Sequence, residues 1–173
     1  MDKTDYMDNK ILKECIDLAL DSDCKKLRFG AVLYDVGTEK IVARSFNRIM
    51  GPFAHLCEKE CIRNSIPSRT ESMIGACSHA EERLLIPGAT LGFDLSACEI
   101  YVQGIRMRSD GQFDLLVKDV ETFTCIRCAT QMHIAGLRAI NVWLEDEWHP
   151  ISPSAAMVQA FNYASGAWEP DSV

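Results

Sequence analysis

The chain has 173 residues, a length that fits one domain whose hydrophobic core is large enough for folding without disulfides or bound metals. Apolar residues make up 47% of the chain and charged residues 25%, which is the balance of an ordinary globular protein. The formal net charge of −7 disfavours a protein that grips a nucleic-acid backbone, because phosphate neutralisation needs a basic surface. A small, discrete ligand is therefore the expected partner.

No membrane anchor or secretion signal is predicted. The sequence lacks a run of about 18 apolar residues, and its polar first residues lack the apolar core of a signal peptide. We expect a cytoplasmic protein with no membrane partner, in a compartment where thiols stay reduced. The eight cysteines then need an explanation other than disulfides.

The predicted elements alternate between helices and strands along one undivided domain, residues 1–173. In chain order they are a helix over 8–24, strands over 30–35 and 40–47, a helix from 78 that ends before 87, a strand over 99–104, a helix over 124–136, a strand over 139–145 and a helix over 153–165. Residues 48–76 are expected to be irregular, and residues 105–122 to form a polar insert. This order favours an α/β domain with a mixed sheet between layers of helices.

The segment Cys125-x-x-Cys128 has the spacing of a metal half-site at the start of a helix. Residues three apart lie on one helix face, so both sulfurs can reach one ion. The free N–H groups and positive end of the helix favour the thiolate that binds zinc. Thr124 stands where a helix cap is needed, and its hydroxyl is expected to accept a hydrogen bond from those N–H groups.

The segment His79-x-Glu81 is expected to open another helix, since Ser78-x-x-Glu81 has the spacing of a capping box. His79 with the two cysteines would give zinc three protein ligands and leave a fourth position for water, as in catalytic sites. Glu81 would then transfer protons between that water and a substrate. Each motif has a simpler interpretation, since C-x-x-C also forms redox pairs and Glu81 could serve only as a cap. Together, H-x-E and a later C-x-x-C are typical of zinc deaminases.

Beyond these motifs, the chain from about 11 to 148 resembles the cytidine deaminase superfamily, and within it the deoxycytidylate deaminases. The resemblance includes the first-strand pattern 29–32, the strand end 46–48, the series His55-x-Cys57-x-x-x-Cys61-x-Arg63, Cys77 and His79-Ala80-Glu81. It implies a three-layer α/β/α sandwich with a mixed sheet of about five strands. It also implies zinc-dependent removal of the 4-amino group of a cytosine nucleotide, deoxycytidine monophosphate first, and a homo-oligomer. Thr124 departs from the family, which has proline there.

The resemblance also assigns residues outside the metal motifs. Asn47 would contact the sugar, and the Ala80 N–H would contact the base. His55, Cys57, Cys61 and Cys77 could hold a second, structural zinc, or the cysteines could be ordinary buried thiols. Arg63 and Arg69 could clamp a 5′-phosphate, or they could be solvated loop charges.

Two other functions stay open. The same chemistry could act on a base in nucleic acid or on another nucleobase, which the basic residues Arg106, Arg108 and Lys118 of the insert would suit. A zinc-stabilised binding protein without catalysis is the third hypothesis. Glu81 argues against it, because holding a metal does not require that carboxylate.

Overall fold

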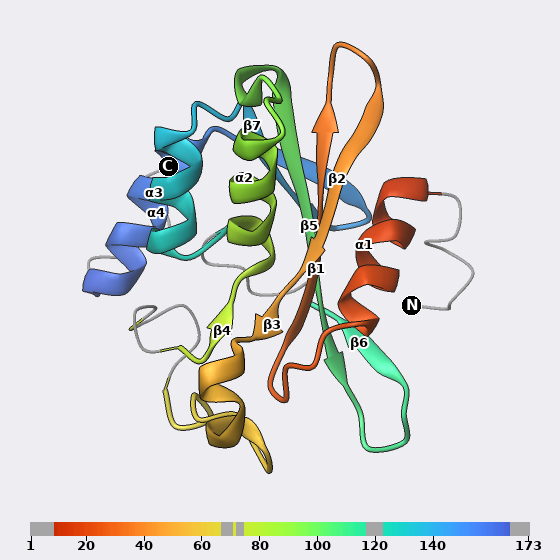
Figure 1. Cartoon of the computed structure of the whole chain (residues 1–173), viewed down its shortest axis with the longest axis vertical. Helices are drawn as coiled ribbons and strands as arrows, with labels where there is room; N and C mark the ends of the chain where they lie inside the picture. The colour runs from red at the N-terminus through yellow and green to blue at the C-terminus, as the bar shows by residue number, and fades with distance from the viewer. Residues whose placement is uncertain (1–8, 67–70, 72–74, 117–122, 167–173) are drawn as a thin grey trace.

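The computed structural model describes residues 9–66, 71, 75–116 and 123–166 and has a mixed α/β architecture (Figure 1). A six-stranded sheet has the order β2-β1-β5-β7-β8, and β6 pairs with the end of β5. Only β5 and β7 run parallel, and the other neighbours are antiparallel. The strands are β1 (Arg28–Asp35), β2 (Lys40–Phe46), β5 (Cys98–Met107), β6 (Phe113–Leu115), β7 (Ala139–Leu144) and β8 (Glu147–Ile151). The predicted mixed sheet between helices is confirmed.

Helices cover both faces of the sheet, as Figure 1 shows. α1 (Lys10–Leu20) lies on one face, and α2 (Ala80–Thr90), α3 (Ile126–Ile134) and α4 (Pro153–Ser165) lie on the other. Strand side chains alternate between the faces, so β5 directs Ile100 and Val102 toward the core shared with α2, α3 and α4. On the α1 side, Trp143 of β7 packs with Leu12 and Ile16.

Gly30 allows α1 to approach β1 closely. A Cβ atom at Gly30 would lie 2.0 Å from the Cys15 carbonyl oxygen and 2.7 Å from the Ala19 nitrogen. The helix itself begins at Asn9, whose side chain accepts a hydrogen bond from the Leu12 N–H. It ends at Leu20 rather than at residue 24, because residues after it bond to Asn47 instead of continuing the helix.

A second, two-stranded sheet lies next to the start of α2. It consists of β3 (Arg48–Ile49) and β4 (Cys77–Ser78), and the short 3-10 helix η1 (Gly51–Cys57) follows β3. A further 3-10 turn, η2 (Leu95–Ala97), precedes β5. The segment predicted to be irregular thus carries local structure that ties the residues before α2 to the end of β2.

Two further boundaries differ from the prediction. α2 continues through Pro87 to Thr90, because proline removes one N–H donor while the Pro87 carbonyl still accepts from Leu91. β8 was not predicted. It returns from β7 through Glu145 and Asp146, which both have positive φ, 48° and 66°, where sequences usually place glycine or asparagine.

Part of the polar insert also forms regular structure. β5 extends to Met107, and β6 pairs with its last residues; Arg108 and Asp114 form an ion pair across this hairpin. Lys118 lies outside the described residues. Within the described part of the chain, no helix is long and apolar enough to cross a membrane.

Candidate metal centre

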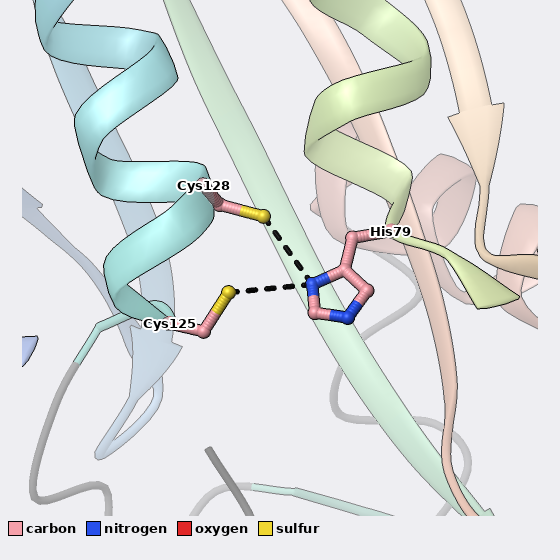
Figure 2. Close-up of side chains that lie close together, drawn as sticks. All are labelled: His79, Cys125 and Cys128. Carbon is pink, nitrogen blue, oxygen red and sulfur yellow. Dashed lines mark hydrogen bonds between the residues drawn. The ribbon is translucent and has the colours of Figure 1, made fainter. Parts of the chain in front are cut away.

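His79, Cys125 and Cys128 come together where α2 and α3 begin (Figure 2). The His79 Nδ1 atom lies 3.4 Å from the Cys125 sulfur and 3.3 Å from the Cys128 sulfur. All three ligand atoms lie within 4.8 Å of one another, and both cysteines are buried. Among the described residues, this is the one such group of potential metal ligands.

Two of these three residues are themselves the N-caps of their helices. His79 precedes α2 and Cys125 precedes α3, both with extended backbone. The predicted caps Ser78 and Thr124 are therefore each one residue too early. The shift has a physical reason: a cap residue lies outside the helix, where its side chain can turn toward the other helix and a shared ion.

Glu82, rather than Glu81, completes the cap of α2. Its carboxylate accepts a hydrogen bond of 2.9 Å from the His79 N–H. The same carboxylate pairs with Arg127 of α3 at 2.6 Å, with both side chains largely shielded from solvent. Glu82 thus joins the two helix starts that carry the ligands. It also leaves Glu81 available for another role.

Glu81 is buried beside the three potential ligands. Its carboxylate accepts a 2.9 Å hydrogen bond from the Thr124 hydroxyl, so Thr124 donates to Glu81 rather than capping α3. Burial raises the pKa of the Glu81 carboxyl, and His79 and the Thr124 hydrogen bond act in the opposite direction. Glu81 and all three potential ligands are close enough to influence one another's ionisation.

The two cysteines differ in their readiness to ionise. The hydrogen bond from Cys128 lowers the pKa of Cys125 to about 4, with His79 contributing in the same direction. The same hydrogen bond and burial raise the pKa of Cys128. Burial is the largest single influence and lowers the pKa of His79, but the hydrogen bond and charge of Cys125 together with the charge of Glu81 outweigh it, so the net pKa is raised. The surroundings therefore favour a thiolate at Cys125, and a divalent cation would favour one at Cys128 as well.

This donor set fits zinc. One imidazole nitrogen and two thiol sulfurs are ligands that zinc prefers, and they converge from two rigid helix starts. Three protein ligands leave one tetrahedral position open to water or substrate. The buried Glu81 carboxylate lies beside this group, although a purely structural metal site does not require it.

The two expected substrate contacts near the centre lie at defined positions. Ala80 is buried at the first position of α2, where backbone N–H groups have no partner within the helix. Asn47 is buried at the end of β2; its oxygen accepts from Phe29 and Ser22, and its amide donates to Leu27. Asn47 therefore fixes the start of β1, and its contact with a sugar stays a prediction.

One of the two arginines predicted to clamp a phosphate lies in the described part of the chain. Arg63 donates to the Glu71 carbonyl at 2.9 Å, and Arg69 lies outside the described residues. A cavity of about 530 Å³ instead brings Arg48 and Arg83 together, with Ser78 in its wall. Both arginines were missed as candidates, although Arg48 follows Asn47 and Arg83 lies one turn after His79.

The residues predicted to bind a second zinc lie in the stretch of chain from η1 to β4. Cys57 and Cys61 are buried, Cys77 lies in β4, and His55 is exposed in η1. Their ligand atoms do not form a group within 4.8 Å among the described residues.

Comparison with known proteins bears on the fold. No protein-family model matches the chain, and no curated protein matches it. A solved structure of cytidine deaminase from Burkholderia pseudomallei is similar, with a TM-score of 0.52 and 13% sequence identity. The match covers 84% of this chain and 92% of the other. The chain therefore has a cytidine deaminase-like fold, with a His/Cys/Cys group suited to zinc where α2 and α3 begin.

Proposed function

We propose that the protein is a zinc-dependent hydrolase that deaminates a cytosine nucleotide, deoxycytidine monophosphate to deoxyuridine monophosphate, with release of ammonia. One observation carries this proposal: Glu81 is buried beside His79, Cys125 and Cys128, while Glu82 performs the capping. A structural zinc needs no such carboxylate. The cytidine deaminase-like fold supports the same chemistry.

In this mechanism, His79, Cys125 and Cys128 would hold a zinc ion, which would supply Lewis-acid activation of water when bound. Glu81 accepts a proton from the attacking water, delivers it to ring N3, and then helps the amino group to leave. Water adds at C4 and ammonia departs, so the cytosine base becomes uracil. Thr124 orients Glu81 through its hydroxyl, and Ala80 offers its N–H to the base.

The cavity lined by Arg48, Arg83 and Ser78 supports a phosphate on the substrate. Two guanidinium groups suit a phosphate monoester, which can accept paired hydrogen bonds from each. Asp23 also lines the cavity and lies 4.0 Å from Arg48, so the cations outnumber this carboxylate. Ser78, the neighbour of His79, lines the cavity, so a phosphate bound there would lie close to the metal centre.

A second candidate substrate is the nucleoside cytidine, which the name of the similar solved structure favours. Ammonia release should therefore be measured across cytosine, adenine and guanine compounds as bases, nucleosides and monophosphates. Highest kcat/KM for deoxycytidine monophosphate supports the proposal, whereas a preference for the nucleoside replaces it with the second candidate. Intact zinc content with no turnover of any compound would favour a binding protein, and salt-resistant binding of single-stranded DNA or RNA would favour a nucleic-acid substrate.

Variants of the cavity test the phosphate contact separately from the chemistry. Arg48→Ala and Arg83→Ala should each lower the preference for the monophosphate over deoxycytidine by about tenfold. Arg44→Ala is the matched control, because Arg44 pairs with Glu14 of α1 and does not line the cavity. An unchanged preference in both cavity variants would refute the proposed phosphate contact but would not contradict the proposed deamination.

We also propose a homo-oligomer acting in the cytoplasm. Exposed apolar side chains on α2, α3 and α4 support self-association: Ile86, Ile134, Val158 and Phe161. Light scattering during size-exclusion chromatography would give the subunit number, and a monomer at micromolar concentration would contradict the proposal. A second, structural zinc at His55, Cys57, Cys61 and Cys77 is the remaining proposal from the sequence, and more than one zinc per chain, falling by one in Cys57→Ser, would support it.

A further inference from the structure

Glu82 and Arg127 form a two-point contact between the helix starts that Figure 2 shows. Glu82 lies three residues after His79, at the start of α2. Arg127 lies between the two cysteines, at the start of α3. The Arg127 Nη2 group donates to one Glu82 oxygen at 2.8 Å, and the Arg127 Nε atom lies 2.6 Å from the other oxygen. A guanidinium that contacts both oxygens of a carboxylate fixes its direction as well as its distance.

The Glu82 carboxylate is also held from two further directions. The oxygen that accepts from Arg127 Nη2 accepts the 2.9 Å hydrogen bond from the His79 N–H as well. The other oxygen accepts a 3.3 Å hydrogen bond from the side-chain amide of Gln131, one turn after Arg127 in α3. The side chains of Glu82 and Arg127 are only 13% and 20% exposed. Solvent therefore screens this pair less than it screens an ion pair on the open surface.

A second polar contact joins the same helix starts, from the Thr124 hydroxyl to the Glu81 carboxylate. Glu81 moves a proton in the proposed mechanism, so its hydrogen bonds change during the reaction. Further along the helices, Leu84 of α2 and Met132 of α3 belong to one apolar core. The contact of Glu82 with Arg127 is therefore suited to a separate role, which is to keep the two helix starts in place while Glu81 reacts.

We propose that Arg127 and Glu82 are positioning residues of the metal centre, and that their two-point contact sets the affinity for zinc. The ligands come from two separate segments, so the affinity depends on how firmly those segments are held at the spacing that one ion requires. Residues that orient metal ligands from outside typically contribute a factor of about 10–100 to metal affinity. The proposal rests on zinc binding by the His/Cys/Cys group, as the proposed function does.

Loss of the guanidinium would loosen both segments. Without Arg127, the Glu82 charge would stay largely shielded from solvent and without its counter-charge, and it would gain free energy by turning outward. That movement would break the bond between Glu82 and the His79 N–H, and the His79 side chain is one of the potential ligands. The segment of the two cysteines would lose the same anchor. We therefore expect a zinc site that still forms but holds the ion less tightly.

The test is the zinc dissociation constant of the full chain, measured under reducing conditions by competition with a chromophoric zinc chelator. Arg127→Met removes the guanidinium and keeps an unbranched side chain, and we expect zinc to bind about 10- to 100-fold more weakly. In a double-mutant cycle with Glu82→Gln, the double variant should bind within about twofold of the weaker single variant. Wild-type affinity in Arg127→Met, or additive losses in the double variant, overturns the proposal.

Two control variants separate metal affinity from stability and from charge. Gly30→Ala disturbs the packing of α1, on the face of the sheet opposite α2 and α3, and should leave the zinc affinity unchanged. Arg138→Met removes a guanidinium that lies 3.5 Å from Glu99, outside the metal centre, and should also leave it unchanged. A loss in either control as large as that in Arg127→Met means that the effect is not specific, which overturns the proposal.

Arg127→Lys covers the case in which Arg127→Met fails to fold. Lysine keeps the charge but cannot contact both carboxylate oxygens in the fixed directions of a guanidinium, so we expect zinc to bind about three- to tenfold more weakly. With Co²⁺ in place of zinc, the visible absorption bands of a tetrahedral site should lose intensity in this variant. Wild-type zinc affinity in Arg127→Lys overturns the proposal.

None of these measurements uses activity, so this proposal and the proposed deaminase can fail separately. Unchanged zinc affinity in the Arg127 variants of a chain that releases ammonia refutes the positioning role alone. A wild type that binds zinc, loses affinity in Arg127→Met and releases no ammonia from any compound refutes the proposed function alone.

Discussion

Removing the hydroxyl of Thr124 should slow the reaction without weakening substrate binding. Thr124 is buried, 3% exposed, and its hydroxyl donates a 2.9 Å hydrogen bond to the Glu81 carboxylate. Thr124→Val keeps the shape of the side chain but leaves Glu81 without this donor. Because Glu81 moves the proton in the proposed mechanism, the loss of its orientation should lower the rate of the chemical step.

The expected size follows from the kind of hydrogen bond. A bond to a charged group contributes about 1.5–3 kcal/mol. If that contribution is lost in the transition state, at about 1.36 kcal/mol per tenfold change, kcat falls by about 10- to 150-fold. KM should change less than about threefold, since Thr124 acts through Glu81 rather than on the substrate.

The assay is steady-state ammonia release with the best substrate of the compound panel, together with zinc content and thermal unfolding. Thr124→Ser is the matched control, because it keeps the hydroxyl and should retain most of kcat. The reasoning is refuted if Thr124→Val retains the wild-type kcat, or if Thr124→Ser loses as much as Thr124→Val. A loss of zinc in the valine variant would instead assign Thr124 to the stability of the metal centre.

Three further predictions separate catalysis, metal binding and packing. Glu81→Gln should abolish turnover while retaining zinc and stability. Glu82→Gln should retain the proton acceptor but lower the free energy of unfolding by about 1–3 kcal/mol, measured by urea denaturation. Equal stability of the two variants would contradict the capping role of Glu82. Gly30→Ala should cost at least about 2 kcal/mol, or a melting temperature lower by roughly 4–8 °C, because its Cβ would overlap α1; Gly51→Ala, with open space around its Cβ, should change little. Removal of zinc by a chelator should lower the melting temperature of the wild type more than that of His79→Ala, and equal shifts would argue against zinc at this residue.

The sequence was most informative about residues whose chemical type limits what they can do. Histidine and paired cysteines at helix starts predict a shared ion because few other residues bind zinc, and His79, Cys125 and Cys128 do come together. The sheet could be predicted as well, since its strands follow the hydrophobic pattern. β8 could not be predicted, because the turn before it is formed by Glu145 and Asp146, which are not the residue types usual at positive φ in a tight turn.

Roles that depend on a shift of one residue could not be predicted. Local preference places the helix caps at Ser78 and Thr124, but the ligands His79 and Cys125 are the caps, so each cap lies one residue later than predicted. Glu82 then becomes the cap and Thr124 a donor to Glu81.

The way β6 branches from β5 has a consequence for how the protein could diversify. β7 pairs with Glu99–Val102, in the first part of β5, while β6 pairs with Ile105–Met107 at its end. The part of β5 that carries Ile100 and Val102 into the core shared with α2 and α3 is therefore separate from the β5–β6 hairpin. Changes of length or charge in that hairpin can alter what approaches the molecule without displacing Cys125 or Cys128. The hairpin and the metal centre can therefore be varied separately, in variants designed to change one and to keep the other.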